Sequence, residues 1–158
     1  MSWWRKLFTN RCDGLGYRVG LIPLRLMIGV IFLYHGLQKV GIIGDGGFGG
    51  TAEMLRGMGF PGPAFWAVLL VLAEVAGGAM LVLGLLPRVG AAALAIVMVV
   101  ALLAAHRGDP FAATHSQQML LAGCITILIA GGGALSVQPS RPDSAATVAR
   151  DAAAEESP

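Results

Sequence analysis

The sequence predicts an all-α, polytopic membrane protein whose four transmembrane helices pack as an antiparallel bundle. Of its 158 residues, 56% are hydrophobic and only 13% are charged, whereas a soluble domain carries about 25% charged residues. Its mean hydropathy is +0.72. Four apolar runs of about 17–23 residues are each long enough to cross a hydrocarbon core about 30 Å thick. These observations exclude a soluble globular domain, and the net charge of +2 is too small to indicate a nucleic-acid partner.

The first predicted span, residues 21–40, is apolar but contains Arg25, His35, Gln38 and Lys39. On an α-helix, the three basic residues among these lie within roughly 80° of one another. A charge at the centre of a membrane helix costs about 2.5–3.5 kcal/mol. We therefore expect this basic face to be buried against partners, although Arg25 and Lys39 lie close enough to the helix ends to reach the interface by snorkelling instead.

The connection over residues 41–63 is the longest in the chain and is rich in glycine. Its Gly44-x-Gly46-x-x-Gly49 pattern matches a dinucleotide-binding fingerprint, but no strand precedes it, so that interpretation is rejected. Thr51 is expected to cap a short helix over residues 51–58. The loop is expected to fold back and cover the polar face of the first helix.

The second predicted span, residues 64–86, contains Glu74. It is the one acidic residue inside an apolar span, and Arg25 or His35 is expected to be its partner. Ala73, Gly77 and Gly78 place small residues at close spacing, which favours the near approach of another helix.

The remaining spans are predicted at residues 89–105 and 119–135, joined by a polar loop over residues 106–118. The first helix is expected to begin near Pro23, because proline suits a first helical turn. The three predicted parts of the chain are an interfacial amphipathic segment, a transmembrane domain and a disordered tail. They cover residues 1–20, 21–136 and 137–158.

The distribution of basic residues predicts that both termini are cytoplasmic. Four spans place the two termini on one side of the membrane, and the positive-inside rule assigns the more basic side to the cytoplasm. That side holds seven of the eleven basic residues: Arg5, Lys6, Arg11, Arg18, Arg88, Arg141 and Arg150. The loops at 41–63 and 106–118 are then expected to face outward.

A polar site between the first two spans is the strongest candidate for chemistry. From the outer end, the helical rise places His35 about 6 Å deep, Glu74 roughly 14 Å and Arg25 roughly 21 Å. Such a site suits a small amphipathic molecule such as a quinone, or a proton relay. The alternative is a buried polar network that only fixes helix packing.

Other cofactors receive less support from the sequence. His35 and His106 on different helices are compatible with haem ligation, but a lone histidine pair is usually not a haem site. The two cysteines, Cys12 and Cys124, are far apart and form no CxxC pair, so no metal site is predicted.

Several of these features together resemble the DoxX family of small bacterial membrane proteins. The resemblance covers residues 21–135. It rests on Arg25, His35-Gly36-x-Gln38-Lys39, Phe48, Glu74 with Gly77-Gly78, the turn from Gly84 to Arg88, and a histidine after the third span.

The resemblance implies a multi-pass protein of the bacterial cytoplasmic membrane that is a subunit or accessory protein of a quinone-linked redox or oxidative-stress system. Glu74, His35 and Arg25 would be its catalytic residues, with Gln38, Lys39, Phe48 and His106 as the quinone-binding residues. Soluble redox proteins and a second copy of the chain are candidate partners. Two other classes stay open: a proton-coupled transporter that uses Glu74, and a non-catalytic membrane scaffold for redox partners.

Overall fold

The computed structural model describes residues 14–105, 108, 110–133 and 136, and the described part is helical. In chain order, its elements are α2 (Gly14–Val40), α3 (Phe48–Gly57), α4 (Pro63–Leu83), α5 (Pro87–Val100), the π-helical turn η1 (Ala101–Ala105) and α6 (Phe111–Ala130). The four long helices, with η1 extending α5, are each long and apolar enough to cross a membrane. The predicted all-α class and the four spans are therefore confirmed.

The first helix begins earlier than the sequence predicted. α2 starts at Gly14 and continues through Pro23, which lies inside the helix rather than in its first turn. Proline removes one backbone hydrogen-bond donor from a helix, but membrane helices tolerate it because neighbouring groups satisfy the freed backbone. The prediction of a start near Pro23 was wrong because the apolar pattern alone does not separate a first-turn proline from an interior one.

The fourth helix also begins earlier, at Phe111 rather than at residue 119. The polar residues from Thr114 to Gln118 were assigned to a loop but form the first turns of α6. Several of their polar groups are satisfied locally, as in the bonds from Thr114 Oγ1 to the Phe111 carbonyl and from Gln118 Nε2 to Thr114 Oγ1. The other end also comes earlier than predicted, because α6 ends at Ala130, with Gly131 as its C-cap, rather than at residue 135.

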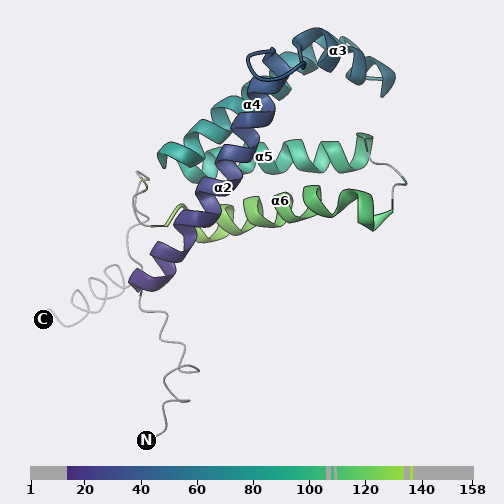
Figure 1. Ribbon diagram of the computed structural model, residues 1–158. Helices are drawn as coiled ribbons and strands as arrows, with labels where there is room; N and C mark the ends of the chain where they lie inside the picture. Colours follow the sequence, from purple (N-terminus) through teal and green to yellow (C-terminus); the bar gives the residue numbers. More distant parts are fainter. Residues whose placement is uncertain (1–13, 106–107, 109, 134–135, 137–158) are drawn as a thin grey trace, which may run out of the picture.

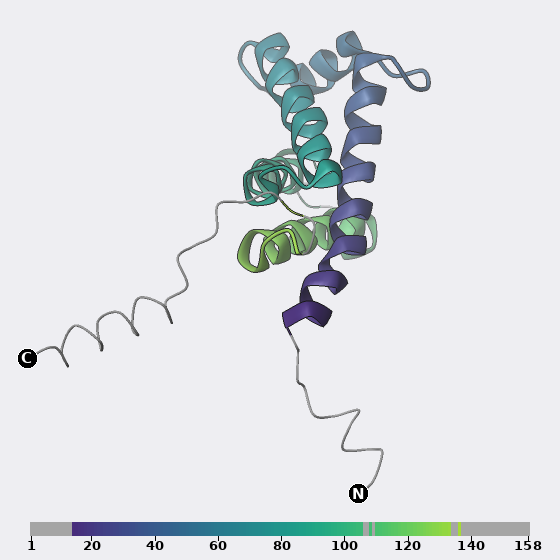
Figure 2. The same ribbon diagram turned by 90° about the vertical axis from the view of Figure 1, so that its left-hand side faces the viewer.

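The long helices form two antiparallel hairpins that cross each other. Figure 1 shows α2 running beside α4, and α5 beside α6. In Figure 2 the first hairpin stands upright while α5 and α6 are seen nearly end-on, so the second hairpin passes across the first. The helices are thus paired as an antiparallel bundle requires, and the two pairs are crossed rather than aligned.

Glycine residues explain why the hairpins approach so closely. A Cβ atom added at Gly78 would lie 2.8 Å from the Gly29 carbonyl oxygen of α2, and one added at Gly77 would lie 3.3 Å from the Gly90 carbonyl oxygen of α5. Backbone therefore meets backbone on both sides of α4, as small residues allow in membranes. The predicted role of Gly77 and Gly78 in close helix packing is confirmed.

The apolar core lies where the hairpins meet. It is built from side chains of all four long helices, and its largest fully buried members are Phe32, Leu81, Leu94 and Ile127. Cys124 is fully buried among them and is a free thiol. Many apolar side chains point outward instead, which fits a protein whose outer surface contacts lipid.

The short helix α3 differs from its prediction at its first turn. Gly47, rather than Thr51, is the N-cap, and Thr51 lies one turn inside the helix. Its hydroxyl donates to the Gly47 carbonyl over 3.3 Å, and the side chain is buried together with Leu55. The segment at 1–13 and the tail at 137–158, predicted to be interfacial and disordered, lie outside the described residues.

We predict that Gly78→Ala weakens the α2–α4 pairing. The new methyl group would collide with backbone atoms of Gly29 and Leu33, which cannot move aside independently. Overpacking of this kind costs about 1–3 kcal/mol, measurable as a lower unfolding midpoint in mild detergent. Gly20→Ala is the control, because a Cβ atom there meets nothing within 4 Å. Equal midpoints for the two variants would contradict the backbone contact.

Candidate functional site: a buried ion pair beneath α3

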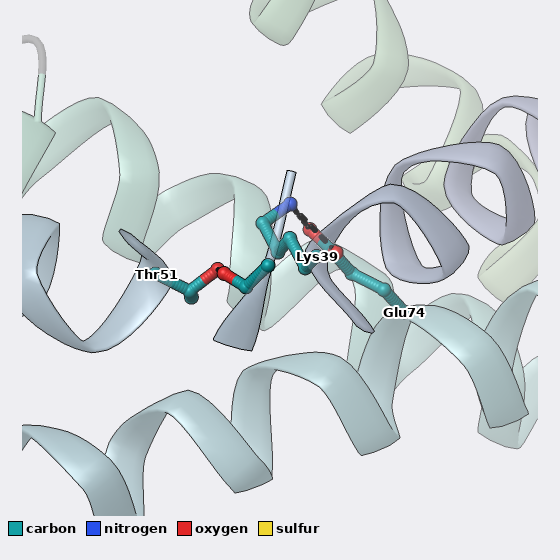
Figure 3. A network of polar contacts seen from close by, with 4 residues as sticks. Lys39, Thr51 and Glu74 are labelled. Atoms are coloured by element: carbon teal, nitrogen blue, oxygen red, sulfur yellow. Dashed lines mark hydrogen bonds and ion pairs between the residues drawn. The ribbon is translucent and has the colours of Figure 1, made fainter. Parts of the chain in front are cut away.

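The centre of the candidate site is an ion pair between α2 and α4. Lys39 Nζ lies 2.8 Å from Glu74 Oε1 and 2.7 Å from Oε2, so the ammonium group contacts both carboxylate oxygens. The Glu74 side chain is 4% exposed and that of Lys39 is 22% exposed. Figure 3 shows the two side chains pointing toward each other, with Thr51 of α3 nearby. The other ion pair among the described residues, Glu53 with Arg56, lies on the exposed face of α3.

The packing of α2 on α4 determines where this pair forms. A Cβ atom at Gly36 would lie 3.2 Å from the Glu74 Cβ and 3.1 Å from the Val75 backbone nitrogen. The bare backbone of Gly36 therefore lets α2 pass directly beside Glu74. Lys39 follows three residues later, on the same face of α2 one turn along, and its long side chain reaches back to the carboxylate.

The segment between α2 and α4 covers this end of the hairpin. Figure 1 shows α3 lying across the end where α2 and α4 are joined. Thr51 and Leu55 are its buried residues. The loop before α3 is tied to the end of α2, since a Cβ atom at Gly46 would lie only 2.2 Å from the Gln38 carbonyl oxygen. The loop therefore folds back onto the end of α2, while His35, which belongs to the predicted polar face, stays exposed.

Arg25 and His35, the partners expected for Glu74, do not pair with it. Arg25 is 3% exposed, and its Nη1 donates instead to the Gly132 carbonyl over 2.8 Å. It lies 14 residues before Lys39 on the same helix, about 21 Å away along the axis. The expectation was wrong because the angle about the helix axis predicts only which face a residue lies on. Contact with Glu74 also requires a residue at the same position along the helix axis.

The other predicted residues lie at different distances from the pair. His35 is exposed and its ring meets Tyr34 edge-on, with centroids 5.8 Å apart. Gln38 is half-buried beside the glycine-rich loop, and Phe48 is 39% exposed at the start of α3. His106, which the haem interpretation needs, lies outside the described residues. Within the described part of the chain, no three His, Cys, Asp or Glu side chains form a cluster suited to a metal ion.

This arrangement supplies a hydrogen-bond donor and a proton acceptor in one apolar setting. The Lys39 ammonium can donate to a ligand oxygen, and the Glu74 carboxylate can accept a proton. An ion pair removed from water needs nearly complete pairing to offset its desolvation. A polar ligand that competes for either group therefore changes the balance of charge at the site.

Sequence reasoning missed two features of this region. Thr51 was assigned a capping role, but its side chain is buried inside α3 and donates to the Gly47 carbonyl. The carbonyl partner of Arg25 was also missed, because a backbone acceptor leaves no signal in the residue types. The spacing from Gly36 to Lys39 was the one available signal for the Lys39–Glu74 contact.

Comparison with known proteins agrees with this architecture. The family model described as DoxX matches residues 20–107, which include the ion pair and its cover. The chain is 27% identical over 124 residues to a protein of Bacillus subtilis (strain 168) named "Putative oxidoreductase CatD". That match covers 78% of this chain and 87% of the relative. No solved structure shows a significant match.

We predict that Lys39→Met destabilises the protein by about 3–5 kcal/mol, because it leaves a buried carboxylate without its partner. Arg56→Met is the matched control, since it breaks the exposed pair with Glu53 and such pairs contribute about 0–1 kcal/mol. Unfolding in detergent measures both. Similar losses in the two variants would show that Glu74 does not depend on Lys39.

We predict that Gly46→Ala loosens the cover without changing the core. The methyl group would collide with the Gln38 backbone, whereas a Cβ atom at the neighbouring Gly47 meets nothing within 4 Å. Hydrogen exchange should accelerate across α3 in Gly46→Ala and stay unchanged in Gly47→Ala. Unchanged exchange in both variants would mean that the loop is not held by the end of α2.

Proposed function

We propose, since the chain belongs to the DoxX family, that it is a membrane subunit or accessory protein of a quinone-linked redox system. The Bacillus subtilis relative is named as a putative oxidoreductase, which supports the redox class. The proposed site is the Lys39–Glu74 pair beneath α3. Its proposed location is the bacterial cytoplasmic membrane, with both termini in the cytoplasm and this site toward the outer face.

The observation that carries the proposal is a buried carboxylate, Glu74, held in an ion pair by the half-buried Lys39 between two membrane-spanning helices. Ionisable groups at such positions are costly, and in membrane proteins they usually mark ligand or proton pathways. The pair lies near the covered end of its hairpin, where the glycine-rich loop approaches α2. A quinone combines an apolar ring and tail with two carbonyl oxygens, which matches a polar centre inside an apolar shell.

The chemistry follows from the two charged groups. Reduction of a quinone to a quinol takes up two electrons and two protons. In the proposal, Lys39 donates a hydrogen bond to a quinone oxygen, and Glu74 transfers protons to and from the bound molecule. A partner redox protein supplies the electrons. Gln38 and Phe48, which lie at the same end of α2 and at the start of α3, border the proposed quinone site.

The orientation is supported by the charge difference between the two ends of α2. Among the described residues, Arg18, Arg25 and Arg88 lie at the end away from α3, whereas Lys39 and Arg56 lie at the α3 end. The positive-inside rule assigns the arginine-rich end to the cytoplasm. The ion pair then opens toward the outer leaflet.

A double substitution separates function from packing. Replacing a buried ion pair by apolar residues of similar volume is often neutral or stabilising. We predict that Lys39→Met with Glu74→Leu remains folded in the membrane but loses co-purifying quinone and activity in a complementation assay. Arg56→Met with Glu53→Leu is the control and should retain both.

The outcomes distinguish the three functional classes. Bound quinone in the wild type that disappears in the buried double variant supports the proposal. Full activity of that variant would assign the pair a packing role and favour a scaffold for redox partners. Proton-coupled efflux from proteoliposomes that is lost in Glu74→Gln, with no bound quinone, would favour a transporter.

A further inference from the structure

We propose that the end of the molecule opposite α3 binds the phosphate headgroup of an anionic phospholipid. The site lies where the C-terminus of α6 meets α2 and α5, and its basic residues are Arg18, Arg25 and Arg88. It lies about 21 Å along α2 from the ion pair, so this proposal stands or falls independently of the proposed redox site.

Arg25 is a buried cation whose hydrogen bonding is incomplete. It is 3% exposed, and its Nη1 donates to the Gly132 carbonyl. Its Nε is buried and has no hydrogen-bond partner, and no carboxylate of the described residues forms an ion pair with it. A carbonyl offers only a partial negative charge, and a guanidinium removed from water needs fuller compensation than that.

Arg88, on α5, is a second arginine whose hydrogen bonding is incomplete. Its Nη2 donates to the Ile129 carbonyl over 3.3 Å, and its Nε is likewise buried without a partner in the described structure. The two acceptor carbonyls are three residues apart at the end of α6, so both guanidinium groups gather at one helix terminus. Two arginines exceed the roughly half negative charge that a helix C-terminus provides.

Close backbone packing brings the third arginine to the same place. A Cβ atom at Gly132 would lie 2.3 Å from the Pro87 ring, and one at Gly133 would lie 2.3 Å from the Arg18 carbonyl oxygen. The segment after α6 is therefore wedged between the start of α5 and the first half of α2. Arg18 and Arg25 lie on the same face of α2, two turns apart.

The charge at this junction is uncompensated within the described part of the chain. The acidic residues of the described part are Asp45 in the loop before α3, Glu53 on α3 and Glu74 on α4. None of them lies at the arginine-rich end. An anion at the arginine-rich end would complete the hydrogen bonding of the Arg25 and Arg88 guanidinium groups, whose Nε atoms have no partner in the described structure. Arg18 is exposed and Arg88 is half-buried, so an incoming phosphate meets these two first, with the charge of Arg25 behind them.

The surroundings favour a lipid over a free anion. Arg88 lies at the second position of α5 and Gly132 just beyond α6, so the cluster is at the helix ends, where headgroups lie. Leu86, Val89 and Ile129 beside it are 44%, 55% and 75% exposed, and provide apolar surface for acyl chains. Basic pockets between membrane helices recognise anionic headgroups in this way.

The test compares lipid binding by the full-length protein in neutral detergent. Native mass spectrometry with phosphatidylglycerol and phosphatidylcholine should show a preference for the anionic lipid. Arg18→Gln and Arg88→Gln should each weaken phosphatidylglycerol binding about fivefold. Arg56→Gln is the control, because it removes an exposed arginine at the opposite end. Arg25→Lys retains the charge and keeps the inner position testable if Arg25→Gln fails to fold.

Three results would overturn the proposal. The first is equal phosphatidylglycerol binding by Arg18→Gln, Arg88→Gln and Arg56→Gln. The second is complete competition by millimolar inorganic phosphate, which would assign the site to a free anion. The third is an anionic preference that appears only after Asp143, Asp151, Glu155 and Glu156 are neutralised, which would make the chain's own carboxylates the occupants. Loss of quinone binding with intact lipid binding would overturn only the redox proposal.

Discussion

The backbone contact between α2 and α4 determines most of what this protein can do. Gly29 faces the Gly78 carbonyl, and Gly36 faces the Val75 backbone nitrogen and the Glu74 Cβ atom, so α2 has no side chain of its own at these two points of contact. The same closeness allows Lys39 to reach both oxygens of Glu74. Gly77, on the other side of α4, brings α5 equally near, and the second hairpin crosses the first there. Glycine packing thus places the charged groups as well as the helices.

The charged groups at the two ends of α2 are compensated in different ways. At the α3 end, a half-buried lysine and a buried glutamate neutralise each other. At the opposite end, Arg25 and Arg88 bind helix-terminal carbonyls, and their Nε atoms have no partner within the described residues. A complete pair is suited to exchange protons with a neutral ligand, whereas an incomplete set of cations is suited to hold an anion. These are the physical grounds for assigning different ligands to the two ends.

Access to the ion pair depends on the segment between α2 and α4 that lies over this end of the hairpin. α3 is short and lies between glycine-rich connections, and Gly41, Gly44, Gly59 and Gly62 adopt positive φ angles there. Left-handed backbone is accessible to glycine at little cost, so the connections can turn sharply on both sides of α3. Thr51 and Leu55 are the buried residues through which α3 packs on the hairpin. In the proposed function, entry of a quinone to the pair would depend on how firmly these two side chains and the Gly46 contact hold the segment.

The sequence by itself determined the all-α class, the four spans, the close packing at Gly77 and Gly78, and Glu74 as the acidic residue around which a site could form. Composition and run length carry that information, because a bilayer sets both the length and the polarity of a spanning helix. Only the tertiary structure decided that Glu74 pairs with Lys39, that Arg25 binds the Gly132 carbonyl, and that the hairpins cross. Helical periodicity reports the direction of a side chain about its own axis. The height at which two helices meet, and the backbone groups that become acceptors, depend on packing between residues far apart in the chain.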